Sequence, residues 1–141
     1  MTKILVLCTG NSCRSQMARA FLKSFDSGLM VRSAGISAVG TVNEGAIKAM
    51  AEVGIDISDQ MSDPVDVYLG TEWDYVITVC GEAAESCPEF LGTVKNRVHI
   101  GFDDPSTAVG DKNYIISEFR RVRDKIKEQL YDFYSSEIMA Q

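Results

Sequence analysis

The chain has 141 residues, the length of one compact domain, and its 45% hydrophobic and 24% charged residues are typical of a folded protein. Its 14 Lys and Arg against 20 Asp and Glu give a formal net charge of −6, and no basic cluster is interleaved with aromatic residues, which argues against a nucleic-acid partner. No apolar run approaches the roughly 18 residues that span a bilayer, so no membrane partner is expected. An acidic protein can still bind a small anion where positive potential is concentrated locally.

The first residues of the chain predict a cytoplasmic location, and this location determines how the cysteines are interpreted. The apolar stretch at 4–7 is shorter than the roughly 7–15 residues of a signal-peptide core. In the reducing cytoplasm, cysteines are expected to be free thiols that serve in catalysis or metal binding more often than in structural disulfides. The sequence has four of them: Cys8, Cys13, Cys80 and Cys87.

The first half of the chain predicts two strands and two helices. A short apolar run at 3–7 indicates a buried strand, and after a turn-forming cluster a helix begins near Arg14. A second short strand is expected at 30–33. Asn43 is a good N-cap for a second helix, which Gly54 follows.

The second half predicts two more strands and a long helix. The run at 75–79 is the strongest strand pattern in the chain, and a weaker one lies at 97–100. The C-terminal segment is predicted to be an amphipathic helix because its apolar residues fall on one stripe. These residues are Phe119, Val122, Ile126, Leu130 and Phe133.

The alternation of strands and helices predicts one α/β domain over residues 1–141, a four-stranded parallel open sheet with helices on both faces. Ligands of such sheets bind beyond the carboxyl ends of the strands. Cys8 and Cys80 each follow directly after a predicted strand. If these two strands are neighbours, the two thiols face one cleft.

The segment that follows the first strand has the composition of an anion-binding loop. Cys8 and Arg14 are separated by five residues, enough for backbone N–H groups to surround a tetrahedral oxyanion at the start of a helix. Gly10 and Asn11 tolerate the left-handed conformation that such a loop needs. The guanidinium of Arg14 matches two oxygens of the anion. The predicted substrate-binding residues are Thr9, Gly10, Asn11, Ser12, Cys13, Arg14 and Ser15.

Cys8 is the candidate nucleophile of this loop. The positive field is expected to depress its pKa, so that the thiolate is present at neutral pH, and Ser15 could donate a hydrogen bond to it. A cysteine at the end of a buried strand can also be a simple small hydrophobic residue. The strand before the loop, the Gly-Asn turn and the helix after it favour the functional interpretation.

Cys8–Ser15 resembles the phosphate-binding loop of the low-molecular-weight protein tyrosine phosphatase superfamily. Further stretches resemble one branch of it, the thioredoxin-coupled arsenate reductases, and the similarity covers nearly the whole chain. These stretches are 8–18, 33–36, 54–58, 101–105 and 119–124.

The resemblance implies a relay of three cysteines. Cys8 would attack arsenate, and Cys80 would attack Cys8, releasing arsenite and leaving a Cys8–Cys80 disulfide. Cys87 would then attack Cys80, and thioredoxin would reduce the resulting Cys80–Cys87 disulfide. The segment 81–86 must bend or unwind to bring the last two sulfurs together, so we expect it to be mobile once oxidised. No cofactor is implied.

The resemblance also implies a general acid. Asp104 precedes Pro105, which restricts the direction of its carboxylate, and we expect it to protonate the oxygen that leaves arsenic or phosphorus. Asp103 is the alternative. A tyrosine phosphatase would need only Cys8, Arg14 and Asp104, and a non-enzymatic anion-binding or redox-sensing role is a third possibility.

The electron donor and the oligomeric state are less firmly indicated. Related enzymes use glutathione with glutaredoxin, but the six residues between Cys80 and Cys87 favour thioredoxin by resemblance. A monomer is the default expectation. Cys13 is expected to pack beneath the loop without a catalytic role, and the sole histidine, His99, to be structural. The cysteine spacings also disfavour a structural zinc site.

Some relatives hold a potassium ion near the loop, with residues that match Asn11, Ser33 and Asp63. The carboxylate that completes this site is replaced here by Arg19. A guanidinium would repel the cation and could pair with Asp63. We therefore predict no metal site and no potassium requirement. The stretch 106–116 matches the family poorly.

Overall fold

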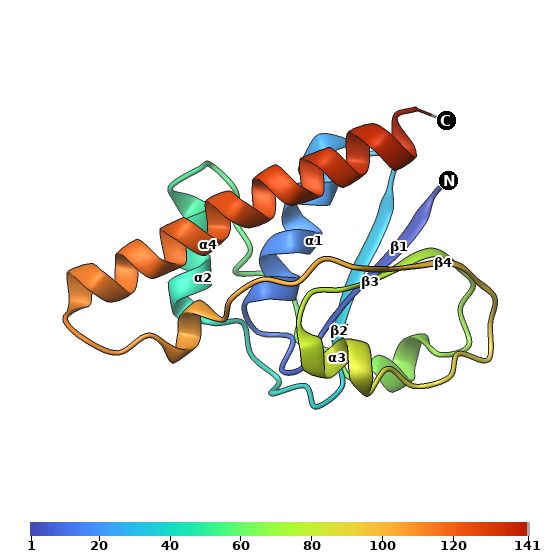
Figure 1. Cartoon of the computed structure of the whole chain (residues 1–141), viewed down its shortest axis with the longest axis horizontal. Coiled ribbons are helices and arrows are strands. Elements are labelled where there is room, and N and C mark those ends of the chain that lie inside the picture. Colours follow the sequence, from blue (N-terminus) through green and yellow to red (C-terminus); the bar gives the residue numbers. More distant parts are fainter. Residues whose placement is uncertain (141) are drawn as a thin grey trace.

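The computed structural model describes residues 1–140 and contains one four-stranded parallel sheet (Figure 1). The strands lie in the order β2-β1-β3-β4, and every neighbouring pair is parallel. This confirms the predicted fold class. The strands are β1 (Lys3–Cys8), β2 (Met30–Gly35), β3 (Trp73–Thr78) and β4 (Val94–His99).

The helices lie on both sides of this sheet. The connections from β1 to β2 and from β3 to β4 run in opposite directions across the sheet, and right-handed crossovers therefore place α1 and α3 on opposite faces. Helix α4 packs against α1 and α2 (Figure 1). The helices are α1 (Arg14–Phe25), α2 (Glu44–Ala51), α3 (Gly81–Glu85) and α4 (Lys112–Phe133), and the short turns are η1 (Val65–Tyr68), η2 (Pro105–Thr107) and η3 (Tyr134–Ile138).

The two central strands carry the core. Ile4, Leu5, Val6 and Leu7 of β1 are fully buried, as expected of a strand covered on both faces. The five apolar residues predicted for the stripe of α4 are all buried. Strand β4, in contrast, is a largely exposed edge strand with a polar sequence.

The strands expected at 30–33 and 75–79 occupy Met30–Gly35 and Trp73–Thr78, and the larger differences from prediction lie in β4 and α3. Strand β4 occupies Val94–His99, three residues earlier than its apolar pattern indicated, because an exposed edge strand does not need apolar side chains. Helix α3 was not predicted, since five residues are too few to show a helical period. The predicted cap was correct, because the Asn43 side chain accepts hydrogen bonds from the N–H groups of Gly45 (2.8 Å) and Ala46 (3.2 Å).

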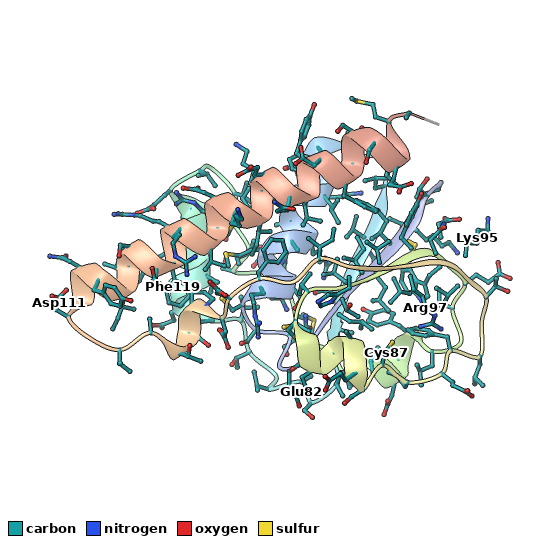
Figure 2. All side chains as sticks on the ribbon, in the orientation of Figure 1. Glu82, Cys87, Lys95, Arg97, Asp111 and Phe119 are labelled. Carbon is teal, nitrogen blue, oxygen red and sulfur yellow. The ribbon has the colours of Figure 1, made fainter. Side chains whose placement is uncertain are left out.

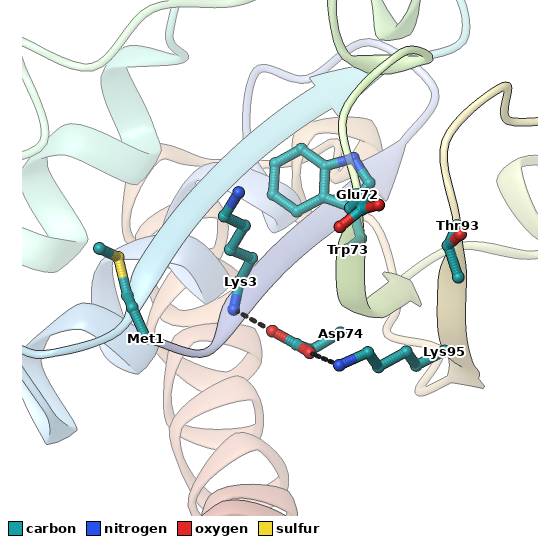
Figure 3. Close-up of a pocket in the computed structure, with 7 residues that line it drawn as sticks. All are labelled: Met1, Lys3, Glu72, Trp73, Asp74, Thr93 and Lys95. Atoms are coloured by element: carbon teal, nitrogen blue, oxygen red, sulfur yellow. Dashed lines mark hydrogen bonds and ion pairs between the residues drawn. The ribbon is translucent and has the colours of Figure 1, made fainter.

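One surface pocket lies at the amino ends of the strands, at the opposite edge from Cys8 and Cys80 (Figure 3). There the carboxylate of Asp74 on β3 accepts a hydrogen bond from the backbone N–H of Lys3 at 2.8 Å and pairs with Lys95 at 3.1 Å. These contacts join β1, β3 and β4 at their starts. The polar residues of this pocket connect the strands, and the pocket lies away from the predicted active-site cysteines.

The end of β2 approaches the loop after β1 so closely that only glycine fits. A Cβ on Gly35 would lie 2.5 Å from the carbonyl oxygen of Thr9 and 3.0 Å from Cβ of Asn11. The obstructing oxygen belongs to the backbone, so it cannot rotate away. Gly35 therefore sets how close the loop lies to the sheet.

We predict that Gly35→Ala displaces the loop and destabilises the fold by about 1–3 kcal/mol, the usual cost of an added methyl group in a filled space. Urea unfolding and calorimetric titration with arsenate would measure the loss of stability and of oxyanion affinity. Gly70→Ala is the matched control, because a Cβ there meets nothing within 4 Å. Equal unfolding midpoints for the two variants would contradict this account.

Candidate active site

The loop between β1 and α1 is held open by hydrogen bonds to its carbonyl groups. Three consecutive carbonyl oxygens accept hydrogen bonds from the segment that follows β2: Cys8 from the N–H of Ile36 (3.1 Å), Thr9 from that of Ser37 (2.9 Å) and Gly10 from that of Val39 (3.0 Å). The carbonyl of Ser12 accepts from the N–H of Asn43 at 2.8 Å. The loop's acceptors are thus satisfied on its outer side.

The donors of the same loop have no such partners. Within residues 1–140, the backbone N–H groups of residues 10–14 donate to no protein acceptor. Because backbone N–H groups at the start of a helix have no intrahelical partner, these five successive donors are available to an external acceptor. A tetrahedral oxyanion supplies acceptors of this kind at the start of a helix.

Asn11 fixes the shape of the loop. It is fully buried and has a φ of 50°, the left-handed conformation predicted for this position. Its side chain donates to the hydroxyl of Ser15 at 2.8 Å and accepts from the backbone N–H of Asp63 at 2.9 Å. Gly10, the other residue expected to permit a positive φ, does not adopt one.

Ser15 does not have the role expected from the sequence. Its buried hydroxyl accepts a hydrogen bond from Asn11, and within the described chain it makes no hydrogen bond to Cys8. The expectation was wrong because the nearest polar partner is the side chain of the loop's own left-handed residue. Ser15 therefore holds the Asn11 side chain in position by accepting its hydrogen bond.

Gln16 is a supporting residue that the sequence analysis missed. It is fully buried at the start of α1 and donates both to the carbonyl of Asn11 (2.8 Å) and to that of Met61 (3.0 Å). The side chain of Gln60 donates to its amide oxygen at 2.8 Å. The available signal was a glutamine directly before Met17 in the first turn of the predicted helix.

Arg14 lies at the rim, where it meets Asp104. One guanidinium nitrogen donates to the carbonyl of Phe102 at 3.0 Å, and the other lies 3.5 Å from the Asp104 carboxylate. Asp104 also accepts from the N–H and the hydroxyl of Ser106, which orients it. Asp103 pairs instead with Arg121 on α4 at 3.1 Å, so the structure brings Asp104 to the loop and not Asp103.

Cys8 and Cys80 follow the neighbouring strands β1 and β3 and are brought together, as predicted. Burial acts to raise the pKa of Cys80, but hydrogen bonds from the Thr9 hydroxyl (3.3 Å), from the N–H of Ala83 and from Cys8 outweigh it and hold that pKa below its usual value. Cys80 therefore ionises more readily than an ordinary cysteine. The Thr9 hydroxyl also lies 3.4 Å from the carboxylate of Glu82, a neighbour that the sequence analysis did not identify.

The expected depression of the Cys8 pKa is wrong for the unliganded loop. Burial raises the pKa of Cys8 to about 12, although Arg14 opposes the shift. The adjacent Cys80 thiol adds to this rise, because two neighbouring thiols do not both ionise readily. Burial and the Asp104 carboxylate likewise raise the pKa of Cys13 to about 12, which makes it a neutral packing residue in this state.

Cys87 stands apart from the other two thiols. It is half-buried beyond the end of α3, where its sulfur accepts a hydrogen bond from Arg97 at 3.6 Å. The five-residue helix α3, which rises roughly 7–8 Å, lies between Cys80 and Cys87 and keeps the two thiols apart. All four cysteines are free thiols in the structure.

The residues that match the potassium site of some relatives do not fit a cation here. The side-chain amide oxygen of Asn11 accepts a hydrogen bond from the N–H of Asp63, and the Asp63 carboxylate accepts one from the hydroxyl of Tyr68 at 3.0 Å. Burial and the nearby Arg32 lower the pKa of Arg19. Its guanidinium nevertheless supplies a positive charge where those relatives bind potassium.

The expected ion pair between Arg19 and Asp63 is not formed within the described residues, because the carboxylate is bound to Tyr68. The fully buried hydroxyl of Ser33 has no hydrogen-bond partner. Over residues 1–140, no group of three or more His, Cys, Asp and Glu gathers to hold a metal ion. That potassium is not required stays a prediction.

The sheet is parallel, and the loop after its first strand combines a cysteine with unpaired backbone N–H groups. This combination defines a class of proteins that bind tetrahedral oxyanions. The family model for low molecular weight phosphotyrosine protein phosphatases matches residues 3–141. The chain belongs to this family.

Its similarity extends to particular relatives. An arsenate reductase of Shouchella clausii is 51% identical over 131 residues, which cover 92% of this chain and 93% of the relative. Among solved structures, an arsenate reductase in the phosphate binding state has a TM-score of 0.80 at 35% identity, covering 96% of this chain and 98% of that one. A thioredoxin-dependent arsenate reductase of Corynebacterium glutamicum has a TM-score of 0.70 at 25% identity, covering 100% of this chain and 64% of that one.

We predict that Thr9→Val raises the pKa of Cys80, because a hydrogen bond to the charged sulfur is lost while burial remains. The pH dependence of Cys80 alkylation, followed by peptide mass spectrometry, measures the shift. Thr9→Ser keeps the hydroxyl and should keep the wild-type profile. An alkylation profile of Thr9→Val that overlays the wild type would show that the hydroxyl does not stabilise the thiolate.

Proposed function

We propose that this protein reduces arsenate to arsenite with Cys8 as nucleophile and Cys80 and Cys87 as resolving thiols. The observation that carries the proposal is a second thiol beside the oxyanion loop: Cys80 follows the strand next to that of Cys8 and has a lowered pKa. A hydrolytic phosphatase has no use for such a thiol. The similarity to arsenate reductases supports the same substrate.

Arsenate would bind with its oxygens on the free N–H groups of residues 10–14 and on the guanidinium of Arg14. Cys8 loses its proton as it attacks, and an oxygen of the bound arsenate accepts it, so that Cys80 remains able to react as the thiolate. The Cys8 sulfur forms a bond to arsenic(V), and Asp104 protonates the oxygen that leaves as water. In this first step arsenic stays at oxidation state five.

Reduction follows when Cys80 attacks the sulfur of Cys8. The new S–S bond forms as the sulfur–arsenic bond breaks, and the electron pair of that bond goes to arsenic, which leaves as arsenite. Two electrons thus pass from two thiols to one arsenic atom. The hydrogen bond from Thr9 favours this step, because the thiolate is the attacking form of Cys80.

The third thiol would move the oxidation to the surface. Cys87 attacks Cys80, Cys8 leaves as a thiolate, and a Cys80–Cys87 disulfide forms with no further change in oxidation state. The short helix α3 has no side-chain hydrogen bond at its N-cap, which favours the unwinding that brings the sulfurs together. We expect its amides to lose exchange protection on oxidation.

We further propose thioredoxin as the reductant and the cytoplasm as the location. The reductant is supported by one structural relative that is described as thioredoxin-dependent. No helix within residues 1–140 is long and apolar enough to cross a bilayer.

The experiment that tests the proposal is NADPH consumption with thioredoxin and its reductase after arsenate is added. Wild type should consume NADPH continuously, whereas Cys87→Ser should lose turnover yet still form about one equivalent of arsenite per enzyme, because the first two thiols complete a single reduction. Cys13→Ser is the matched control, and it should turn over as wild type does.

A different outcome would favour the alternative function. If wild type consumes no NADPH but rapidly hydrolyses an aryl phosphate, the protein is a phosphatase, and Cys80 and Cys87 have no catalytic role. If Cys87→Ser turns over as fast as wild type, the third thiol has no place in the relay.

A further inference from the structure

The sulfur of Cys87 accepts a hydrogen bond from a cation on the edge strand. Nη1 of Arg97 lies 3.6 Å from Sγ of Cys87, and Figure 2 shows the two side chains meeting between the end of α3 and β4. The contact spans ten residues of sequence and joins two elements that the predicted relay must move relative to one another. Nothing in the oxyanion loop depends on it.

A second contact holds the guanidinium in this position. The Cζ atom of Arg97 lies 5.5 Å from the centre of the Phe90 ring, within the range of a cation–π interaction. Cys87 and Phe90 both belong to the connection between α3 and β4. Arg97 therefore contacts this connection at two points, although its own backbone belongs to the sheet.

The other ionisable groups around Cys87 do not replace this cation. His99 lines the same cavity of about 380 Å³ as Cys87 and Arg97, but its Nδ1 is hydrogen-bonded to the hydroxyl of Thr78 at 2.8 Å. Glu85 and Glu89 lie within two residues of Cys87 and are exposed. Their negative charge opposes a thiolate. The Cys87 thiol also lies 3.7 Å from the carbonyl oxygen of Pro88, so among residues 1–140 Arg97 is the cation that contacts this sulfur.

We propose that Arg97 is a positioning residue for the resolving thiol: it holds Cys87 at the end of α3 and stabilises its thiolate for attack on Cys80. The inference rests on the proposed relay. In this step the Cys87 sulfur forms a bond to the Cys80 sulfur, the Cys8–Cys80 bond breaks, and its electron pair leaves with Cys8. The thiolate is the nucleophile of such an exchange, so a nearby guanidinium increases the attacking fraction.

The first test measures the reactivity of Cys87 without arsenate. We expect iodoacetamide to alkylate Cys87 about threefold to fivefold more slowly at pH 7 in Arg97→Gln, the effect of losing one part-exposed charge interaction. Arg97→Lys keeps the charge and should recover much of the rate. Lys95→Gln is the matched control, because it removes another exposed cation of β4 whose partner is Asp74.

The pH dependence separates this role from a merely structural one. At about pH 10, above the usual range of thiol pKa values, a nearby charge no longer limits the attacking fraction, so the alkylation rates should converge. Equal rates of wild type and Arg97→Gln at pH 7, or a difference that persists undiminished at pH 10, would overturn the proposal.

The second test follows the exchange itself in a single turnover with arsenate and no reductant. Acid quench and mass spectrometry should show conversion of the Cys8–Cys80 disulfide to Cys80–Cys87 slowed by the same factor in Arg97→Gln, with an unchanged yield of arsenite. An unchanged conversion rate would overturn the role of Arg97 in the relay. Absence of arsenite from wild type would overturn the proposed function instead, while the alkylation result would still decide whether Arg97 acts on Cys87.

Discussion

The site depends on one constraint: the carbonyl groups of the loop after β1 are bound on its outer side. The segment that follows β2 supplies the N–H groups of Ile36, Ser37 and Val39 for this purpose. Because each peptide unit carries its donor opposite its acceptor, fixing the carbonyls outward leaves the amides of residues 10–14 free for an anion. An acidic chain can thus bind an oxyanion with backbone dipoles and a single arginine.

The three thiols of the proposed relay differ in burial and in hydrogen-bond partners. The thiols are more exposed the later they are oxidised in the relay. Cys8 is buried and its pKa is raised, so the thiol is neutral in the unliganded loop. Cys80 has a lowered pKa and lies beside it, held by Thr9. Cys87 is the outermost and contacts the exposed Arg97. Oxidation can therefore proceed from a protected centre to a surface that a protein reductant can reach.

The sequence was sufficient for the fold and for the placement of Cys8, Cys80 and Arg14, because strand ends, a Gly-Asn turn and an amphipathic stripe are local patterns. It was not sufficient for contacts made across the fold. Ser15 was assigned to Cys8 but is bound by Asn11, and Gln16 was missed, since which polar groups meet is decided by packing. The raised pKa of Cys8 was missed for a similar reason, because the neighbouring thiol of Cys80 and the depth of burial follow from the sheet order.

The most direct measurement is the order in which disulfides form during the first turnover. Fully reduced protein would be mixed with arsenate, quenched in acid at successive times, alkylated and mapped by mass spectrometry. The account predicts a Cys8–Cys80 disulfide that appears first and decays into Cys80–Cys87, with one arsenite released per enzyme before any reductant is added. A disulfide that includes Cys13, or no disulfide at any time, would contradict it.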